Sequence, residues 1–445
     1  AQLKLDTQLD ADLLIFADWI IPVVPRNTVL ENSAIAIKDG KIIAILDQEN
    51  ARARVNAKST ENLRNHVLIP GLVNAHGHIP MTLLRGIADD MPLKQWLEER
   101  IWPLEGRFVS AEFVKQGAQL AVAEMISSGT TCFADMYFFP EEVAKVTISA
   151  GIRAQLASPI MDFPTAWAQV SDEYISKATD LHDMYRNSEQ ISTAFGPHAP
   201  YSVSDGPLKK LQILADELDI PIHMHIHESA QEISDALARD GRRPIHRLAD
   251  LGLISPRLVC VHATQLIDEE IVLLRDLGAS VIHCPESNLK LASGFCQVGK
   301  LLDAGVNVGL GTDGGASNND LDMFGEMRTA AIVAKAVAGN PSAVPAHQAL
   351  EMATINSARA MGLADQIGSL EINKCADIAA IDLDHINTLP MNNPTSHIVY
   401  AVKSSQVSNV WCNGQAVLKN GELKTIDPAM IRENTERWQR KFLGV

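Results

Sequence analysis

Paired cysteines are absent from this chain of 445 residues. Its six cysteines, at positions 132, 260, 284, 296, 375 and 412, are scattered and form no Cys-x-x-Cys pair. This spacing argues against a disulfide scaffold and against a structural zinc site made of thiolates, so we expect mostly buried thiols. No signal peptide is visible from Ala1 onward, and the cytoplasm is the expected compartment.

Long apolar runs and an excess of positive charge are lacking too. No apolar run approaches the ~18 residues of a membrane-spanning helix, so we expect no contact with a membrane. Lys and Arg number 38 against 54 Asp and Glu, and the net charge of −16 argues against nucleic-acid binding. With 46% hydrophobic and 21% charged residues, the chain is typical of a soluble enzyme that acts on a small neutral or cationic molecule.

The two ends of the chain share a β-rich texture that differs from the middle. Short β-like pieces occupy about residues 13–58, and similar pieces return from about residue 365. Asp-Gly at position 39 and Asn-Gly at positions 413 and 420 predict hairpin turns, because these dipeptides tolerate the positive φ of such turns. We therefore predict that residues 1–66 and 366–445 build one small β-sandwich domain, with a helix at the last segment.

Between these ends, short apolar strands alternate with amphipathic helices. The candidate strands are LIPGLVNAHGH, TTCFADM, RAQLASPI, ISTAFGPHAP, PIHMHIHES, LVCVHAT, SVIHCPES and VNVGLGTDG. Eight β-α repeats of this length predict an α/β fold, a (β/α)8 TIM barrel over residues 67–365. An open doubly wound sheet is the alternative, which the even spread of polar residues at the strand ends disfavours.

Histidines gather at the ends of these strands. Of 14 histidines, eight follow this pattern, at positions 76, 78, 198, 223, 225, 227, 262 and 283. In a barrel the carboxyl ends of the strands converge on one face, where the active site is built. Buried imidazoles need partners, and a metal ion is a common one. His76 and His78 flank one glycine, so on a strand both would point the same way and could bind one ion.

The last strand ends in GLGTDGG, which by spacing also fits the GxGxxG template of dinucleotide sites. The motif lies late in the chain, lacks a clear acidic partner about 20 residues on, and carries Asp313 where pyrophosphate would lie. We interpret it instead as a turn of small residues that lets Asp313 reach a cation. A structural turn aspartate is the alternative.

Nitrogen and carboxylate ligands without thiolates suit a catalytic zinc ion, and iron or manganese would also be compatible. Within HMHIHE, three histidines alternate on one face and Glu228 has the opposite parity, so periodicity does not select one ligand among His223, His225 and His227.

The segments PGLVNAHGH, FGPHAPYSVS, HMHIHES and GLGTDGGASNN, in this order, resemble the amidohydrolase superfamily over essentially the whole chain. Within it, they are similar to the deaminases of methylthioadenosine and S-adenosylhomocysteine, with triazine hydrolases as near relatives. The resemblance implies one zinc ion per subunit, held by His76, His78, His225 and Asp313. His225 is selected because the acid/base glutamate of the family follows its ligand by three residues, as Glu228 does here.

The resemblance also implies roles for further residues. Glu228 and Asp313 would carry protons and contact the substrate, and His262 would hydrogen-bond the attacking water or the substrate. Glu105 in WPLEGRF matches the carboxylate that binds the ribose hydroxyls, and His198 matches another substrate contact. The implied reaction is hydrolytic deamination of an adenosine-type nucleoside at purine C6, with an inosine-type product and ammonia.

One departure from the family bears on the substrate. Members that accept S-adenosylhomocysteine are expected to use an arginine near the loop after the third strand. Here Arg153 lies within that strand, where we expect a structural role, and the next arginine is Arg186. We therefore favour 5′-methylthioadenosine and keep S-adenosylhomocysteine as a second substrate. The expected partner is this small molecule, and the sequence is compatible with a homo-oligomer.

Other functions remain as alternatives at this point. The same metal ligands would serve a deaminase or dechlorinase of guanine, cytosine or an s-triazine, against which Glu105 and His198 argue. A non-catalytic metal-binding protein on the same barrel is a third reading, against which retention of Glu228 and Asp313 argues. The other zinc design for base deamination, His-x-Glu with Pro-Cys-x-x-Cys, is absent from the sequence.

Overall fold

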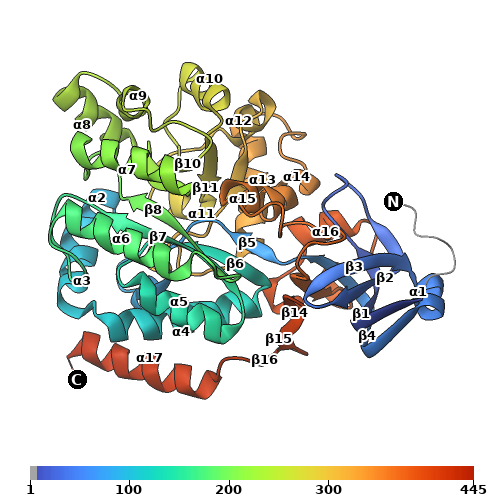
Figure 1. Cartoon of the computed structure of the whole chain (residues 1–445). Helices are drawn as coiled ribbons and strands as arrows, with labels where there is room; N and C mark the ends of the chain where they lie inside the picture. Colours follow the sequence, from blue (N-terminus) through green and yellow to red (C-terminus); the bar gives the residue numbers. More distant parts are fainter. Residues whose placement is uncertain (1–7, 445) are drawn as a thin grey trace.

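The computed structural model describes residues 8–444, which form a parallel barrel beside a separate mixed sheet (Figure 1). The barrel strands pair in chain order: β5 (Leu72–Asn74), β6 (Thr130–Asp135), β7 (Arg153–Ile160), β8 (Ile191–Pro197), β9 (Ile222–Ile226), β10 (Leu258–His262), β11 (Ser280–His283) and β12 (Val308–Leu310). The backbone N–H of Ala75 donates to the carbonyl of Leu310 at 2.9 Å, which brings the end of the first strand onto the last. The predicted (β/α)8 barrel is confirmed.

Helices and helical turns connect the strands and cover the outside of the barrel. They are η1 (Ile79–Leu84), α2 (Leu93–Trp96), η2 (Leu97–Ile101), α3 (Trp102–Phe108), α4 (Ala111–Ser127), α5 (Pro140–Ala150), α6 (Ser171–Tyr185), α7 (Asp205–Leu218), α8 (Ala230–Asp240), α9 (Pro244–Asp250), α10 (Asp268–Leu277), α11 (Pro285–Lys290), α12 (Val298–Ala304), α13 (Met323–Ala338), α14 (Ala346–Met352) and α15 (Ile355–Ala360). Because helices cover them, strands such as β6, β7 and β9 are buried along their whole length. No helix within residues 8–444 is long and apolar enough to cross a membrane.

The separate sheet draws its strands from both ends of the chain, as predicted. Its order is β16-β15-β14-β13-β4-β1-β2-β3. The strands are β1 (Leu9–Ile20), β2 (Leu30–Lys38), β3 (Lys41–Asp47), β4 (Val55–Pro70), β13 (Ile378–Asp382), β14 (Val407–Cys412), β15 (Gln415–Lys419) and β16 (Glu422–Leu423), with helix α1 (Gln48–Arg54) after β3. The two halves meet where β13 pairs with the end of β4, from Pro70 to His66.

The beginning of the first barrel strand differs from the sequence interpretation. The apolar residues Val67–Ile69 belong to β4 and pair with β1 and β13, rather than opening the strand that carries His76. Gly71 separates the two strands, and a Cβ there would lie 2.1 Å from the Thr131 hydroxyl oxygen, so no larger residue fits the crossing. β5 is consequently only 3 residues long. A continuous apolar run conceals this change of sheet, because both strands are buried.

The three predicted hairpin turns are present in the end-built sheet. They join β2 to β3, β14 to β15 and β15 to β16, and each has both central residues at positive φ, from 49° to 76°. Between β13 and β14 lie η3 (Ile386–Thr388), α16 (Pro394–Tyr400) and η4 (Ser404–Gln406).

The last helix, α17 (Pro428–Leu443), leaves the end-built sheet and runs beside α4 of the barrel (Figure 1). The Trp438 ring lies edge-on to Phe113, with centroids 5.2 Å apart, and its Nε1 donates to Gln116 Oε1 at 2.7 Å. The C-terminal segment therefore packs on the helix that leads into β6.

Candidate metal centre and active site

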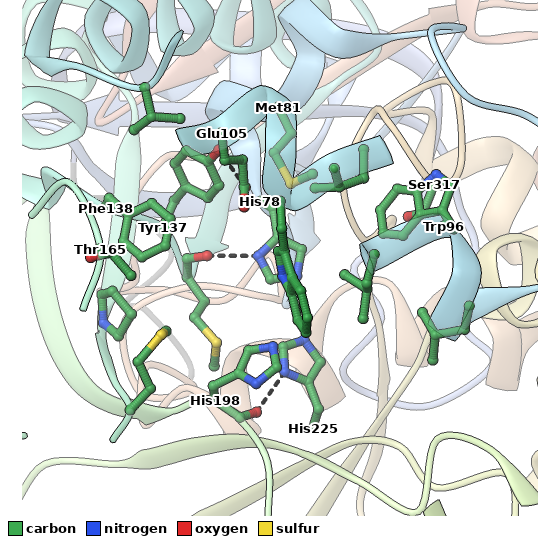
Figure 2. Close-up of a pocket in the computed structure, with 18 of the residues that line it drawn as sticks. His78, Met81, Trp96, Glu105, Tyr137, Phe138, Thr165, His198, His225 and Ser317 are labelled. Atoms are coloured by element: carbon green, nitrogen blue, oxygen red, sulfur yellow. Dashed lines mark hydrogen bonds between the residues drawn. The ribbon is translucent and has the colours of Figure 1, made fainter. Parts of the chain in front are cut away.

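His76 and His78 lie in the chain immediately after β5, at the carboxyl end of the barrel. The His78 Nδ1–H donates to the carbonyl of Met136 at 2.6 Å, which leaves the Nε2 lone pair facing the cavity. His225, at the end of β9, donates from Nδ1 to the carbonyl of His198 at 2.7 Å, so its Nε2 is also a lone-pair donor (Figure 2). The two Nε2 atoms lie 3.3 Å apart. Two lone pairs aimed at each other fit a shared cation.

Asp313 completes this group from the turn after β12. Its Oδ1 lies 3.3 Å from His76 Nε2 and 3.4 Å from His78 Nε2. The buried His76 Nε2 has no hydrogen-bond partner among residues 8–444, which is what a metal ligand without its ion would show. The Asp313 Oδ2 accepts a hydrogen bond from Ser287 at 2.6 Å. Burial opposes ionisation of Asp313, but His76, His262 and His78 outweigh it and hold its pKa well below the usual range.

The donor set is close enough to hold one ion. The ligand atoms of His76, His78 and His225 all lie within 4.8 Å of one another, as do those of His76, His262 and Asp313. Three imidazoles and one carboxylate, with no thiolate, suit zinc in a catalytic site. The residues present therefore fit the predicted metal ion.

Glu228 and His262 stand beside this group. The His262 Nδ1 lies 2.8 Å from Asn288 Oδ1, which makes Nδ1 the protonated nitrogen and turns Nε2 toward the two acids. This Nε2 lies 3.7 Å from Glu228 Oε1 and 3.9 Å from Asp313 Oδ2. Burial raises the pKa of Glu228. The nearby His262 lowers this pKa, and the negative charge of Asp313 raises it. Within one cavity, the pKa of Glu228 is therefore raised and that of Asp313 is lowered.

The cavity over these residues has a volume of about 330 Å³. Glu105 on α3 and His198 after β8 line it together with His78, His225, Glu228 and Asp313. The rest of the wall is largely apolar and includes Met81, Trp96 and Phe138 (Figure 2). Met161 and Phe163 also belong to it. Within the described part of the chain, no Lys or Arg lines the cavity.

The two predicted substrate contacts have distinct surroundings. Tyr137 donates from its hydroxyl to Glu105 Oε1 at 2.7 Å, and burial, partly opposed by this bond, raises the pKa of Glu105 to about 7. His198 is held by Ser202, whose Oγ lies 2.9 Å from Nδ1, and burial lowers the pKa of this histidine to about 4. His198 is therefore a neutral imidazole near pH 7.

The remaining strand-end histidines divide into two groups. His223 lies behind the donor set, with Nε2 at 2.8 Å from His76 Nδ1, so it orients a ligand without reaching the cavity. His227 points away, and its Nε2 accepts from the backbone N–H of Ile245 at 3.1 Å. His283 is buried at the end of β11, and its Nδ1 has no partner in the described chain. All the residues that the sequence places in the site converge, whereas these three do not line the cavity.

Several residues that contact the site escape the sequence interpretation. Tyr137 holds Glu105, Ser287 holds Asp313, and Asn288 orients His262. Ser287 and Asn288 belong to CPESN directly after β11, a polar pair at a strand end that could have been noticed. Tyr137, an aromatic residue after β6, carries no such signal.

The fold and the donor set define a class of protein. It is the class of barrel hydrolases in which candidate metal ligands and acid/base residues lie at the carboxyl ends of the strands. A profile of the Amidohydrolase family matches residues 67–417, and the chain belongs to this family. The prediction made from its motifs is confirmed.

Relatives of known name cover nearly the whole chain. The protein is 49% identical over 431 residues to 5-methylthioadenosine/S-adenosylhomocysteine deaminase of Teredinibacter turnerae, covering 97% of this chain and 98% of that one. It is 39% identical over 420 residues to 5′-deoxyadenosine deaminase of Methanothermobacter thermautotrophicus, covering 93% and 96%. The predicted enzyme class, a hydrolytic deaminase, is confirmed by the family and these relatives.

Solved structures agree with this placement. The crystal structure of an adenosine deaminase from Xanthomonas campestris, with bound zinc, superposes with a TM-score of 0.97 at 48% identity, covering 98% of this chain and 100% of that chain. Atrazine chlorohydrolase TrzN from Arthrobacter aurescens, also with zinc, gives a TM-score of 0.89 at 25% identity, covering 96% and 99%.

Proposed function

We propose that this protein hydrolyses the 6-amino group of an adenosine-type nucleoside, with zinc as its metal ion and 5′-methylthioadenosine as the favoured substrate. The observation that carries the proposal is the joint lining of one cavity by the His–Asp donor set, Glu228 and Glu105. Deamination of such a nucleoside needs three groups: a metal centre, a proton carrier and a carboxylate suited to the vicinal hydroxyls of the ribose. Relatives named as deaminases of such nucleosides support it.

His76, His78, His225 and Asp313 would hold the ion. When bound, zinc supplies Lewis acidity that lowers the pKa of water from 15.7 to about 7 and so makes hydroxide available near neutral pH. Each of the three imidazoles donates a hydrogen bond from Nδ1, which orients its ring. The acceptors are His223 Nε2 for His76, the Met136 carbonyl for His78 and the His198 carbonyl for His225. Such partners raise ligand basicity and fix the ring orientation.

Glu228 and Asp313 transfer the protons of the reaction, and His262 contacts the attacking oxygen. Glu228, whose pKa is raised by burial, gives a proton to the purine ring nitrogen next to C6, which makes that carbon a better electrophile. Asp313, held ionised by the histidines, accepts the proton of the attacking water. His262 offers Nε2 to the oxygen that adds to C6. The tetrahedral carbon then expels the amino group, which leaves as ammonia after taking the proton held by Asp313. The proton of the added hydroxyl passes to Glu228, so that C6 becomes a carbonyl and both acids return to their starting states.

The cavity favours a small apolar 5′ substituent. Glu105 would accept hydrogen bonds from the ribose hydroxyls, and His198 would contact the nucleoside. The 5′ group then lies against an apolar wall in which the described residues offer no Lys or Arg. A methylthio group gains from burial there, whereas the carboxylate of S-adenosylhomocysteine would lose its hydration without a charged partner. The apolar wall therefore supports 5′-methylthioadenosine over S-adenosylhomocysteine, the same preference that the position of Arg153 within its strand suggests.

Ammonia release from a nucleoside panel tests the proposal. The purified holoenzyme is assayed with 5′-methylthioadenosine, S-adenosylhomocysteine, adenosine, guanine, cytosine and an s-triazine, and its metal content is measured. We expect zinc near one equivalent, the highest kcat/KM with 5′-methylthioadenosine, and loss of activity on chelation that zinc restores. Activity confined to a free base or a triazine, or no ammonia from any member of the panel, would contradict the proposal.

A further inference from the structure

We propose that Tyr137 is a positioning residue for substrate recognition: it holds Glu105 in the orientation that binds the ribose of the nucleoside. This inference rests on the function proposed above, in which Glu105 accepts the ribose hydroxyls. It assigns a role in substrate affinity to a side chain from a different segment of the barrel, the loop between β6 and α5.

The contact between the two residues is specific (Figure 2). The Tyr137 hydroxyl donates to Glu105 Oε1 at 2.7 Å, the usual length of an O–H···O hydrogen bond. Among the described residues 8–444, no other side chain or backbone group donates to this carboxylate. Oε1 is thus engaged by the protein, and Oε2 is left for a ligand.

Tyr137 is well placed to act as a fixed donor. Its side chain is 4% exposed and packs beside Phe138, with ring centroids 5.0 Å apart. Burial and the neighbouring Glu105 raise the pKa of its hydroxyl well above the ordinary value, so the proton stays on the tyrosine. A rigid ring carrying a permanent O–H is an anchor with little conformational freedom.

Glu105 needs such an anchor. It lies on α3, a helix of only 7 residues in the long connection between β5 and α4. A glutamate side chain has three rotatable bonds, and ordering it on ligand binding costs affinity. The bond from Tyr137 orders the carboxylate before the ligand arrives. A tyrosine that only fills space would contribute to stability but not to discrimination at the ribose.

Removal of the hydroxyl tests the inference. Tyr137→Phe keeps the ring and is assayed with 5′-methylthioadenosine and with its 2′,3′-dideoxy counterpart, which offers Glu105 no hydroxyl. We expect KM for the ribonucleoside to rise about tenfold, with kcat and the KM for the dideoxy compound within about twofold of the parent. Tyr400→Phe removes a hydroxyl on the distant α16, where Tyr400 lies under Lys335, and should leave both substrates unaffected.

A double-mutant cycle guards against a general packing defect. In a Glu105→Ala background, Tyr137→Phe should have no further effect on KM, because its action passes through the carboxylate. An unchanged KM in Tyr137→Phe, an equal loss with both substrates, or additive losses in the cycle would overturn the role of Tyr137 while deamination by the parent continues. If the parent enzyme itself releases no ammonia from the ribonucleoside, the proposed function fails instead.

Discussion

Glu228 and Asp313 show how two carboxyl groups in one cavity acquire pKa shifts in opposite directions. Both are buried carboxyl groups, and burial by itself raises the pKa of either. Asp313 has three histidines around it, which reverse the effect of burial. For Glu228, His262 alone lowers the pKa, and the charge of Asp313 opposes the ionisation of Glu228. Two acids whose surroundings push their pKa values apart are suited to opposite proton-transfer roles.

Replacement of Glu228 by glutamine tests its role as the proton carrier. The amide keeps the shape but cannot give a proton to the ring nitrogen, so kcat should fall by about 100-fold or more. Zinc content and thermal unfolding should match those of the parent. Glu269→Gln, the same change on the exposed face of α10, is the control and should leave kcat unchanged. A Glu228 variant within about tenfold of the parent would contradict the role.

The pH dependence of KM should report Glu105. Burial raises the pKa of Glu105 to about 7, with the Tyr137 bond acting in the opposite direction. The ionised form is the stronger acceptor for hydroxyl groups and predominates above this pKa, so KM should rise as the pH falls from about 8 to about 6. KM is measured across that range for the parent and for Glu105→Gln, whose side chain does not titrate. A slope that persists in Glu105→Gln would assign the dependence to another group.

At the scale of elements, the turn after β9 places Glu228 by means of two neighbouring segments. His227 has a φ of 54°, in the left-handed region that costs energy for a residue with a Cβ. Glu232 on α8 accepts from the backbone N–H groups of His227 at 3.1 Å and of Glu228 at 2.7 Å. Thr264, after β10, donates from its hydroxyl to the carbonyl of Glu228 at 2.7 Å. Helix α8 and strand β10 together hold this turn.

The Glu232 carboxylate should therefore matter for kcat although it does not contact the donor set. Glu232→Gln replaces one acceptor oxygen by an N–H donor facing a backbone N–H, so the turn loses a hydrogen bond and must shift. We expect kcat to fall several-fold to tenfold and the free energy of unfolding to fall by about 1–3 kcal/mol. Asp235→Asn, on the exposed side of the same helix, is the control. A lower stability with unchanged kcat would show that Glu232 serves folding alone.

At the scale of the whole molecule, a buried ion pair joins the barrel to the end-built sheet. The Arg153 Nε donates to Asp377 Oδ2 at 2.7 Å, and its Nη1 donates to the carbonyl of Glu189 at 2.6 Å. Asp377 also accepts from the backbone N–H of Asn413 at 2.8 Å. Arg153 begins β7, so the pair lies at the end of the barrel opposite the cavity. These contacts agree with the structural role expected for Arg153.

Breaking this pair should affect stability and leave catalysis unchanged. Asp377→Asn leaves the buried guanidinium without its counter-charge, and we expect a loss of about 3–5 kcal/mol in the free energy of unfolding. Chemical denaturation measures it, with kcat and KM expected to stay at parental values. The control is Asp250→Asn, which removes the partner of Arg242 in an exposed pair and should change stability little. An unaffected stability in Asp377→Asn would show that water replaces the lost charge.

Much of this architecture could be predicted from the sequence, because the relevant signals are local. The alternation of apolar strands and amphipathic helices predicts the barrel, and Asp-Gly and Asn-Gly predict the three hairpins. The change of sheet between Ile69 and Leu72 could not be predicted in this way, since buried strands of either sheet have the same apolar composition. Strand periodicity did not distinguish His223, His225 and His227 as ligands. In the structure, His223 lies behind the site, and the backbone at His227 turns out of the strand with a φ of 54°.

The sequence by itself determined the fold class, the family and the set of chemically active side chains, since strand periodicity, turn dipeptides and motif spacing are properties of neighbouring residues. Tertiary structure alone decided which of these side chains touch. Tyr137 meets Glu105, Ser287 meets Asp313, and the walls of the cavity come together without a basic residue among those described. The physical reason is that such contacts depend on the packing of segments that lie far apart in the chain.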